Sequence, residues 1–202
     1  NLAHYQLHLE DLVAERTAEL NKLANTDMLT GLLNRTAFFR EVNSLTNSKN
    51  QHPFTLIYMD LDRFKVVNDT HGHDFGDQLL AEFGRRLRAI EAETISLFRI
   101  GGDEFAVLIA CEATSPKLDE ICTSIASLFC RQFEIGIHAY TINASMGLSG
   151  YPCDALTPRQ LLQNADMAMY AAKRGRRKLR WERYTTQLRA TLDRELEIEQ
   201  GL

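Results

Sequence analysis

Apolar residues recur at helical spacing along the first 25 positions of the chain, which contain no glycine or proline. The a and d positions of a seven-residue repeat are occupied, in order, by Leu2, Tyr5, Leu9, Leu12, Arg16, Glu19 and Leu23, so an arginine and a glutamate interrupt an apolar stripe. The pattern predicts an amphipathic helix over residues 1–25 that pairs with a second copy as a parallel dimeric stalk. The alternative is a helix that packs against its own domain.

The next part of the chain alternates helical and strand patterns. After a turn at Thr30 and Gly31, helical spacing predicts a helix over residues 35–45. The following apolar run ends in Asp60 and Asp62, which is typical of a buried strand, over residues 54–62, whose end presents side chains. A glycine-containing loop over residues 68–77 then leads into an amphipathic helix over about residues 75–92.

Two strand-like runs, ISLFRI and EFAVLIA, come next and are joined only by Gly101, Gly102 and Asp103, which predicts a β-hairpin with a glycine-rich, acidic tip. The remaining elements are expected as a helix over 116–132, a strand pair over 134–150 broken near residue 139, a helix over 158–174 and a short strand within 178–182. This alternation predicts an α+β fold, in which helices cover one side of a sheet that contains an antiparallel hairpin.

Composition bounds the function classes. The chain has 202 residues, enough for one compact domain and an appendage, and a formal net charge of −4. That charge gives no general attraction for nucleic acid or an anionic membrane, so neither is expected as a partner of this segment. No run approaches the roughly 18 apolar residues of a membrane span.

The four cysteines, Cys111, Cys122, Cys130 and Cys153, show no metal-ligand spacing and favour reduced thiols in a cytoplasmic protein. The chain begins with asparagine and its last residues have a helical pattern, so we expect a piece of a longer protein, in which a membrane anchor has room upstream.

Carboxylates are expected to converge on one edge of the sheet. Asp60 ends a buried strand, whereas Asp103 and Glu104 stand at the hairpin tip. Turns often carry aspartate and glycine for conformational reasons alone, and this explanation would suffice for either motif taken singly. Together the two motifs place acids beside a core, where a cation is needed to compensate them. Because hard divalent cations bind oxygen ligands on rigid elements, the pattern indicates a magnesium site.

Polar residues suited to a nucleotide lie nearby in the sequence. Lys65 supplies charge for a phosphate, and Asn68 and Asp77 are a polar pair able to read a base edge, with the aspartate favouring guanine over adenine. Gly101 and Gly102 allow close approach of the hairpin backbone to a ligand. A basic cluster, formed by Lys173, Arg174, Arg176, Arg177 and Lys178, is either a triphosphate clamp or a solvated helix end.

These motifs together resemble one family. The segment RIGGDEFAVLI resembles the signature hairpin of the GGDEF family of diguanylate cyclases. Further segments match it in order: DMLTGLLNR at 27–35, MDLDRFKVVNDTHGHDFGDQLL at 59–80, ASMGLSGY at 144–151 and ADMAMYAAKRGR at 165–176. The resemblance spans about residues 26–182, and several motifs in the right order make it specific.

The resemblance implies a ferredoxin-like βαββαβ core, similar to nucleotide cyclases and polymerase palms, with a sheet flanked by helices. It implies a dimeric enzyme that condenses two GTP molecules into cyclic di-GMP and pyrophosphate. Metal ligands would be Asp60, the Leu61 carbonyl, Asp103 and Glu104, holding two Mg²⁺ ions per half-site, and Mn²⁺ is expected to substitute. GTP would contact Lys65, Asn68, Asp77, Gly101, Gly102, Lys173 and Arg176.

By the same resemblance we expect a stalk over residues 1–25, the cyclase domain over 26–182 and a linker helix over 183–202. The linker would lead to an EAL-type phosphodiesterase domain, with a sensor domain upstream; a plain terminal helix is the alternative. The sequence departs from the family pattern twice. Ala92 and Ile95 occupy the positions of the R-x-x-D product-inhibition site, and the segment AAKRGRRK is one residue shorter than usual. The second departure leaves the role of Arg176 open.

Two other functions remain open at this point. A catalytically silent module could bind GTP and regulate a downstream phosphodiesterase with the same metal ligands. A structural dimerisation unit is the third hypothesis, but it would not need a guanine-reading pair and a metal pair on one edge.

Overall fold

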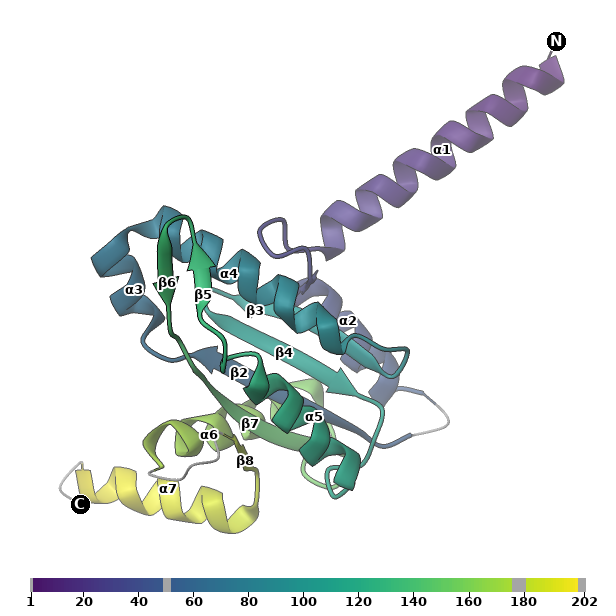
Figure 1. Cartoon of the computed structure of the whole chain (residues 1–202). Coiled ribbons are helices and arrows are strands. Elements are labelled where there is room, and N and C mark those ends of the chain that lie inside the picture. Colours follow the sequence, from purple (N-terminus) through teal and green to yellow (C-terminus); the bar gives the residue numbers. More distant parts are fainter. Residues whose placement is uncertain (1, 49–51, 176–180, 200–202) are drawn as a thin grey trace.

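The computed structural model describes residues 2–48, 52–175 and 181–199. The predicted N-terminal helix is present as α1 (Leu2–Asn25), which projects away from the remainder of the protein (Figure 1). Leu9, Val13 and Leu20 along it are 58%, 62% and 66% exposed. These apolar side chains therefore do not pack on their own domain, contrary to the alternative for this helix.

A six-stranded sheet forms the centre of the domain, with strand order β1-β3-β4-β2-β7-β8. Its strands are β1 (Leu33–Asn34), β2 (Phe54–Leu61), β3 (Ile95–Gly101), β4 (Glu104–Ile109), β7 (Ala144–Tyr151) and β8 (Trp181–Arg183). The four inner strands pair antiparallel, whereas the edge strands β1 and β8 run parallel to their neighbours. With α4 (His73–Leu87) after β2 and α5 (Pro116–Ser127) after β4, this is the predicted ferredoxin-like βαββαβ arrangement.

Helices cover both faces of the sheet, so the pattern-based prediction of a one-sided layer was wrong (Figure 1). One core contains α4 and α5, and the other contains α2 (Arg35–Thr46) and α6 (Pro158–Arg174). The strands β2 and β7 are buried at nearly every position. Strands covered on both sides have continuous apolar runs instead of alternation, and the run at residues 54–59 is of this kind.

Two local predictions also need correction. The segment expected as a loop over 68–77 is helical: α3 (Phe64–His71) is followed directly by α4, and only Gly72, at φ +86°, separates them. Residues 134–150 form three strands instead of a pair, because β5 (Phe133–Ile135) and β6 (His138–Tyr140) make their own two-stranded sheet before β7. After α4, a single 3₁₀ turn (Arg88–Ile90) leads to β3, and α7 (Thr186–Glu199) follows β8.

Helix α6 lies so close to β7 that a side chain at Gly147 would not fit between them. Thr157 caps its N-terminus and Pro158 occupies the first turn, where a missing N–H costs nothing. A Cβ atom on Gly147 of β7 would lie 1.9 Å from the Ala165 carbonyl oxygen and 2.2 Å from the Met169 nitrogen. The glycine therefore permits direct backbone contact, which fixes the distance between α6 and the site-bearing strands.

Candidate active site

The predicted metal-binding residues meet at one end of β2 and β4. Asp60 is directly opposite Glu104 in the antiparallel pair, and Leu61 donates its backbone N–H to the Asp103 carbonyl at 3.2 Å. Residues directly opposite each other share a face of the sheet, so the Asp60 and Glu104 side chains project on the same side. Strand pairing thus gathers Asp60, Leu61, Asp103 and Glu104 as the sequence predicted.

Several charged side chains lie close together at this edge of the sheet. Burial, followed by the charges of Asp60 and Glu104, raises the pKa of Asp103. Lys173 of α6 places its Nζ 2.6 Å from Asp60 Oδ1, although Asp60 was predicted to bind a metal ion and Lys173 a phosphate. Burial alone would lower the pKa of Lys173, but the bond to Asp60 and the charges of the nearby aspartates together outweigh it and raise that pKa. The lysine therefore occupies the place of a compensating cation beside these carboxylates.

These residues fit a magnesium ion that is completed by its substrate. Within the described ranges, no three or more His, Cys, Asp and Glu side chains are arranged to hold a metal by themselves. Mg²⁺ usually binds one or two carboxylates and takes its remaining oxygens from water and substrate phosphates. Asp60 and Asp103, with the Leu61 carbonyl, are such a partial oxygen set.

Sequence reasoning missed two neighbours of this site. Asp166 lies on α6, and burial followed by the charge of Asp60 raises its pKa. Its position seven residues before Lys173, two helical turns on one face, was the available signal. Tyr58 of β2 is buried and hydrogen-bonds Glu104; burial, followed by that bond, raises the pKa of its hydroxyl. The tyrosine restrains a carboxylate that the sequence assigned to metal binding.

The predicted base-reading residues come together where α3 and α4 meet. Asn68 is on α3, and its Oδ1 is buried with no hydrogen-bond partner among the described residues. A Cβ on Gly76 would lie 1.9 Å from that oxygen, so the asparagine rests on α4 one residue before Asp77. Lys65 is exposed in the first turn of α3. An unsatisfied buried acceptor is costly unless a donor arrives, and the exocyclic amine of guanine is one.

A cavity of about 530 Å³ lies beside Lys173 and is lined by Asp62, Arg63, Tyr140, Thr141, Ile142, Asn143 and Lys173. It connects Lys173 with the residues that lead into α3. Gly101 and Gly102 at the hairpin tip are exposed, with open space where a Cβ would stand, and Gly102 has φ +47°. Arg176, the remaining predicted phosphate contact, lies outside the described residues. The structure therefore leaves room for a phosphate chain between Lys173 and the start of α3.

Comparison with known proteins settles the family. The sequence pattern described as "Diguanylate cyclase, GGDEF domain" matches residues 24–179. This chain is a GGDEF domain of the diguanylate cyclase family. It is 37% identical over 164 residues to the bifunctional diguanylate cyclase/cyclic di-GMP phosphodiesterase MucR of Pseudomonas aeruginosa, covering 80% of this chain but only 24% of MucR. The chain thus spans about a quarter of that curated relative.

Solved structures agree with the assignment. The GGDEF-only structure of TpbB (YfiN) from P. aeruginosa superposes with a TM-score of 0.76 and 32% identity, covering 83% of this chain and 99% of that one. The coiled coil and GGDEF domain of DgcB from Caulobacter crescentus, in complex with c-di-GMP, gives a TM-score of 0.75 at 28% identity, covering 90% and 96%. Fold and family are those the sequence predicted.

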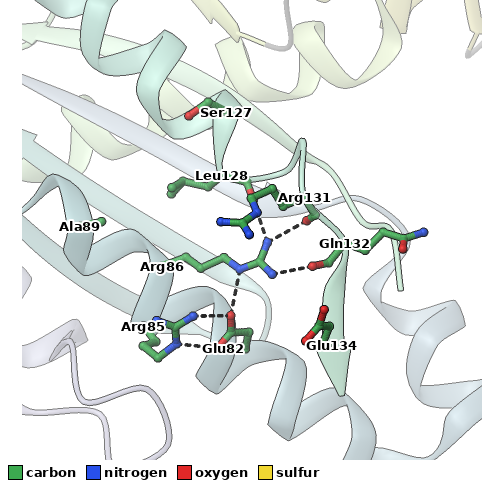
Figure 2. Close-up of a pocket in the computed structure, with 9 residues that line it drawn as sticks. All are labelled: Glu82, Arg85, Arg86, Ala89, Ser127, Leu128, Arg131, Gln132 and Glu134. Carbon is green, nitrogen blue, oxygen red and sulfur yellow. Dashed lines mark hydrogen bonds and ion pairs between the residues drawn. The ribbon is translucent and has the colours of Figure 1, made fainter. Parts of the chain in front are cut away.

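A separate cavity of this GGDEF domain, about 810 Å³, lies between α4 and the segment after α5 (Figure 2). Arg86 lies within it and bonds Glu82 at 2.9 Å and the carbonyls of Leu128, Arg131 and Gln132 at 3.0, 2.8 and 2.6 Å. Its guanidinium also lies 3.8 Å from the centroid of the Phe133 ring. The bond from Arg85 lowers the pKa of Glu82 to about 2, with burial opposing the shift and Arg86 reinforcing it. Arg86 thus ties α4 to the α5–β5 connection.

Arg86→Ala should destabilise the GGDEF domain by about 3 kcal/mol, because it leaves three carbonyls without their charged donor and removes the stack on Phe133. Urea unfolding followed by circular dichroism measures this. The matched control is Arg85→Ala: that neighbouring side chain is 69% exposed and, among the described residues, bonds Glu82 alone, so its loss should lower the free energy of unfolding far less than the loss of Arg86. Equal losses in both variants would refute the structural role of Arg86.

Among the residues that the structure describes, no helix of this GGDEF domain combines the length and hydropathy needed to cross a membrane.

Proposed function

We propose that this GGDEF domain condenses two GTP molecules into cyclic di-GMP and two pyrophosphates, with two domains facing each other. The observation that carries the proposal is the convergence of Asp60, near the end of β2, and Asp103, in the turn that leads into the adjacent β4, with Lys173 2.6 Å from Asp60 and an open cavity lined by that lysine. In each transfer the 3′-oxygen of one GTP bonds to the α-phosphorus of the other. The bond from that phosphorus to the bridging oxygen breaks, pyrophosphate leaves with the electron pair, and the 3′-hydroxyl proton is released.

The residues of the chain divide this task. Asp60, the Leu61 carbonyl, Asp103 and Glu104 would hold Mg²⁺ or Mn²⁺, which when bound neutralises phosphate charge and activates the attacking hydroxyl. Lys65 and Lys173 would bind phosphate oxygens, with Arg176 as a further contact. Asn68 and Asp77 would accept hydrogen bonds from the ring N–H and the exocyclic amine of guanine. Adenine does not offer this pair of donors. Gly101 and Gly102 would let the hairpin backbone approach the nucleotide.

Dimer formation is part of this proposal, because one domain holds one GTP and the reaction joins two. We propose residues 1–25 as the stalk that brings two copies together, residues 26–182 as the cyclase domain and residues 183–202 as a linker helix. The exposed leucines of α1 support the stalk, as does the coiled coil in the DgcB structure. The bifunctional MucR supports an EAL domain after the linker. Cytoplasmic location and an upstream sensor belong to the same proposal.

Product inhibition through the R-x-x-D position is not part of the proposed function. Ala92 and Ile95 stand there, and they form a tight turn in which Ile95 donates its N–H to the Ala92 carbonyl at 2.9 Å. Neither side chain carries a group that could bind a guanine or a phosphate.

The deciding experiment measures pyrophosphate release and cyclic di-GMP formation from GTP with Mg²⁺ at rising protein concentration. Product that grows more than linearly with protein is expected, because only the dimer assembles both halves of the site. A version fused to a dimerising coiled coil should turn over GTP at low concentration as well. GTP binding without product in both versions would overturn the proposal.

That negative result would favour a GTP-binding module that regulates a linked phosphodiesterase. The observation in its favour is that MucR carries both activities in one protein, of which this chain matches only 24%. Intact carboxylates and base-reading residues are compatible with either function, so turnover decides between them.

A further inference from the structure

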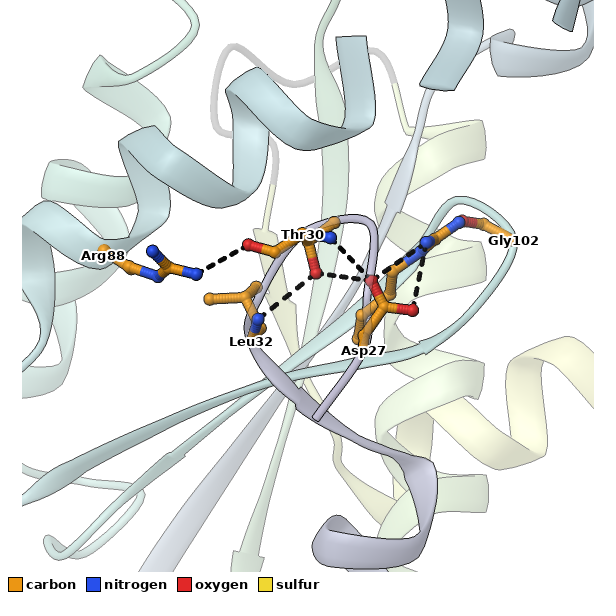
Figure 3. A network of polar contacts seen from close by, with 6 residues as sticks. Asp27, Thr30, Leu32, Arg88 and Gly102 are labelled. Atoms are coloured by element: carbon orange, nitrogen blue, oxygen red, sulfur yellow. Dashed lines mark hydrogen bonds and ion pairs between the residues drawn. The ribbon is translucent and has the colours of Figure 1, made fainter. Parts of the chain in front are cut away.

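Arg99 links the turn that follows α1 to the hairpin tip; Figure 3 labels its two partners, Asp27 and Gly102. Asp27 accepts hydrogen bonds from the Thr30 N–H at 2.8 Å and from Thr30 Oγ1 at 2.7 Å. Arg99 of β3 donates Nη1–H to both Asp27 oxygens, at 3.1 and 3.2 Å. The turn at the start of the motif over residues 27–35 is thus held by its own hydrogen bonds, and the Asp27 carboxylate faces Arg99 of the hairpin.

The same guanidinium holds the tip of the hairpin. Arg99 Nε and Nη2 donate to the Gly102 carbonyl at 3.0 and 2.8 Å. The strand register shifts between Arg99 and Gly101, so the ladder does not fix the tip by itself. Gly102 adds a left-handed φ of +47°, where glycine has the widest conformational freedom.

Asp103 therefore lies between two anchored carbonyl groups. Arg99 holds the Gly102 carbonyl, and the Leu61 N–H holds the Asp103 carbonyl at 3.2 Å. Without the first anchor, the peptide preceding Asp103 is free to rotate while β2 keeps the second. The carboxylate would then lose its fixed position beside Asp60.

We propose that Arg99 is a positioning residue for the reaction: anchored on Asp27 at the base of α1, it fixes the Gly102 carbonyl and thereby sets Asp103 beside Asp60. The inference rests on the proposed function for its effect on turnover. The side chains of Arg99 and Asp27 are only 12% and 24% exposed. Because the pair is partly shielded from solvent, its attraction is stronger than that of an ion pair on the surface. The Thr30 bonds and Arg99 outweigh burial and hold the pKa of Asp27 below its ordinary value.

Two variants test the link without removing the metal-binding residues. Arg99→Lys keeps the charge but loses the fork that reaches both partners, and Asp27→Asn keeps the shape but loses the charged anchor. Each should lower kcat by about 10- to 100-fold, because small displacements of a reacting group have effects of this size. The Mg²⁺ concentration for half-maximal rate should rise, whereas KM for GTP should stay within about threefold, since α3 and α4 carry the base-reading residues. The double variant should be little worse than either single variant.

Arg88→Lys is the matched control. Arg88 donates Nη2–H to the Thr30 carbonyl of the same turn at 2.8 Å and has no bond to the hairpin. It should lower the melting temperature and leave kcat and the Mg²⁺ dependence unchanged. The proposal is overturned if Arg99→Lys and Asp27→Asn behave in the same way, with a lower melting temperature alone.

A separate readout keeps this inference distinct from the proposed function. Electron paramagnetic resonance of Mn²⁺ measures metal binding in the presence of GTP and needs no turnover. If the unmodified chain makes no product, weaker Mn²⁺ binding in Arg99→Lys than in Arg88→Lys still supports the positioning role. Equal Mn²⁺ binding in both variants refutes it.

Discussion

Asp103→Asn should lower kcat for cyclic di-GMP formation by about 10³-fold or more, since a metal-bound carboxylate supports several kcal/mol of transition-state stabilisation. The amide is nearly isosteric and leaves the hairpin backbone bonds in place. Burial and the charges of Asp60 and Glu104 raise the pKa of this carboxyl, so removing its charge relieves repulsion. The variant should therefore be at least as stable as the unmodified chain while it loses activity.

The measurement is product formation beside a thermal melt, at a protein concentration where the unmodified chain is active. Glu120→Gln serves as the control, because this exposed acid of α5 lies outside the site and should change kcat by less than about twofold. Full activity in Asp103→Asn would exclude this carboxylate from the reaction. A melting temperature that falls together with activity would assign it a structural role instead.

Gly147→Ala should destabilise the domain by about 3 kcal/mol or more, because the added methyl meets backbone and not a movable side chain. The Cβ would lie 1.9 Å from the Ala165 carbonyl oxygen, 2.2 Å from the Met169 nitrogen and 2.9 Å from the Ala168 carbonyl carbon. Relief requires α6 to shift as a unit away from β7. Because α6 carries Lys173, the same shift lengthens the 2.6 Å contact to Asp60 and should reduce turnover in the molecules that still fold.

Urea unfolding measures the free energy of unfolding of Gly147→Ala, with Ser149→Ala as the matched control. Ser149 lies on the same strand and face, two residues away, and is buried. Its Oγ has no hydrogen-bond partner among the described residues, so replacing it with alanine should leave stability equal or slightly higher. A Gly147→Ala protein as stable as the Ser149→Ala protein would show that the helix accommodates the methyl group.

Local chemistry explains which parts of the fold could be predicted from the sequence. The hairpin around Gly101 and Gly102, the buried strand ending at Asp60 and the helix over 158–174 each have a short-range signal that tertiary contacts did not override. Placement of helices on both faces did not follow from such signals, because a run of buried residues fits several layer arrangements. The prediction of a loop near Asn68 was wrong for a related reason. Gly72 interrupts the helical pattern for one residue only, so two helices lie where a loop was expected.

The sequence by itself therefore determined the family and the ferredoxin-like core and predicted a set of site residues, because these reside in contiguous motifs. Only the tertiary structure decided which of those residues meet. It paired Lys173 with Asp60, brought Asp166 to the same edge, rested Asn68 on Gly76 and joined Asp27 to the hairpin through Arg99. Each of these contacts joins positions that are 8 to 113 residues apart in the sequence. Spacing along a chain does not specify such contacts until strand pairing and helix packing fix the distances.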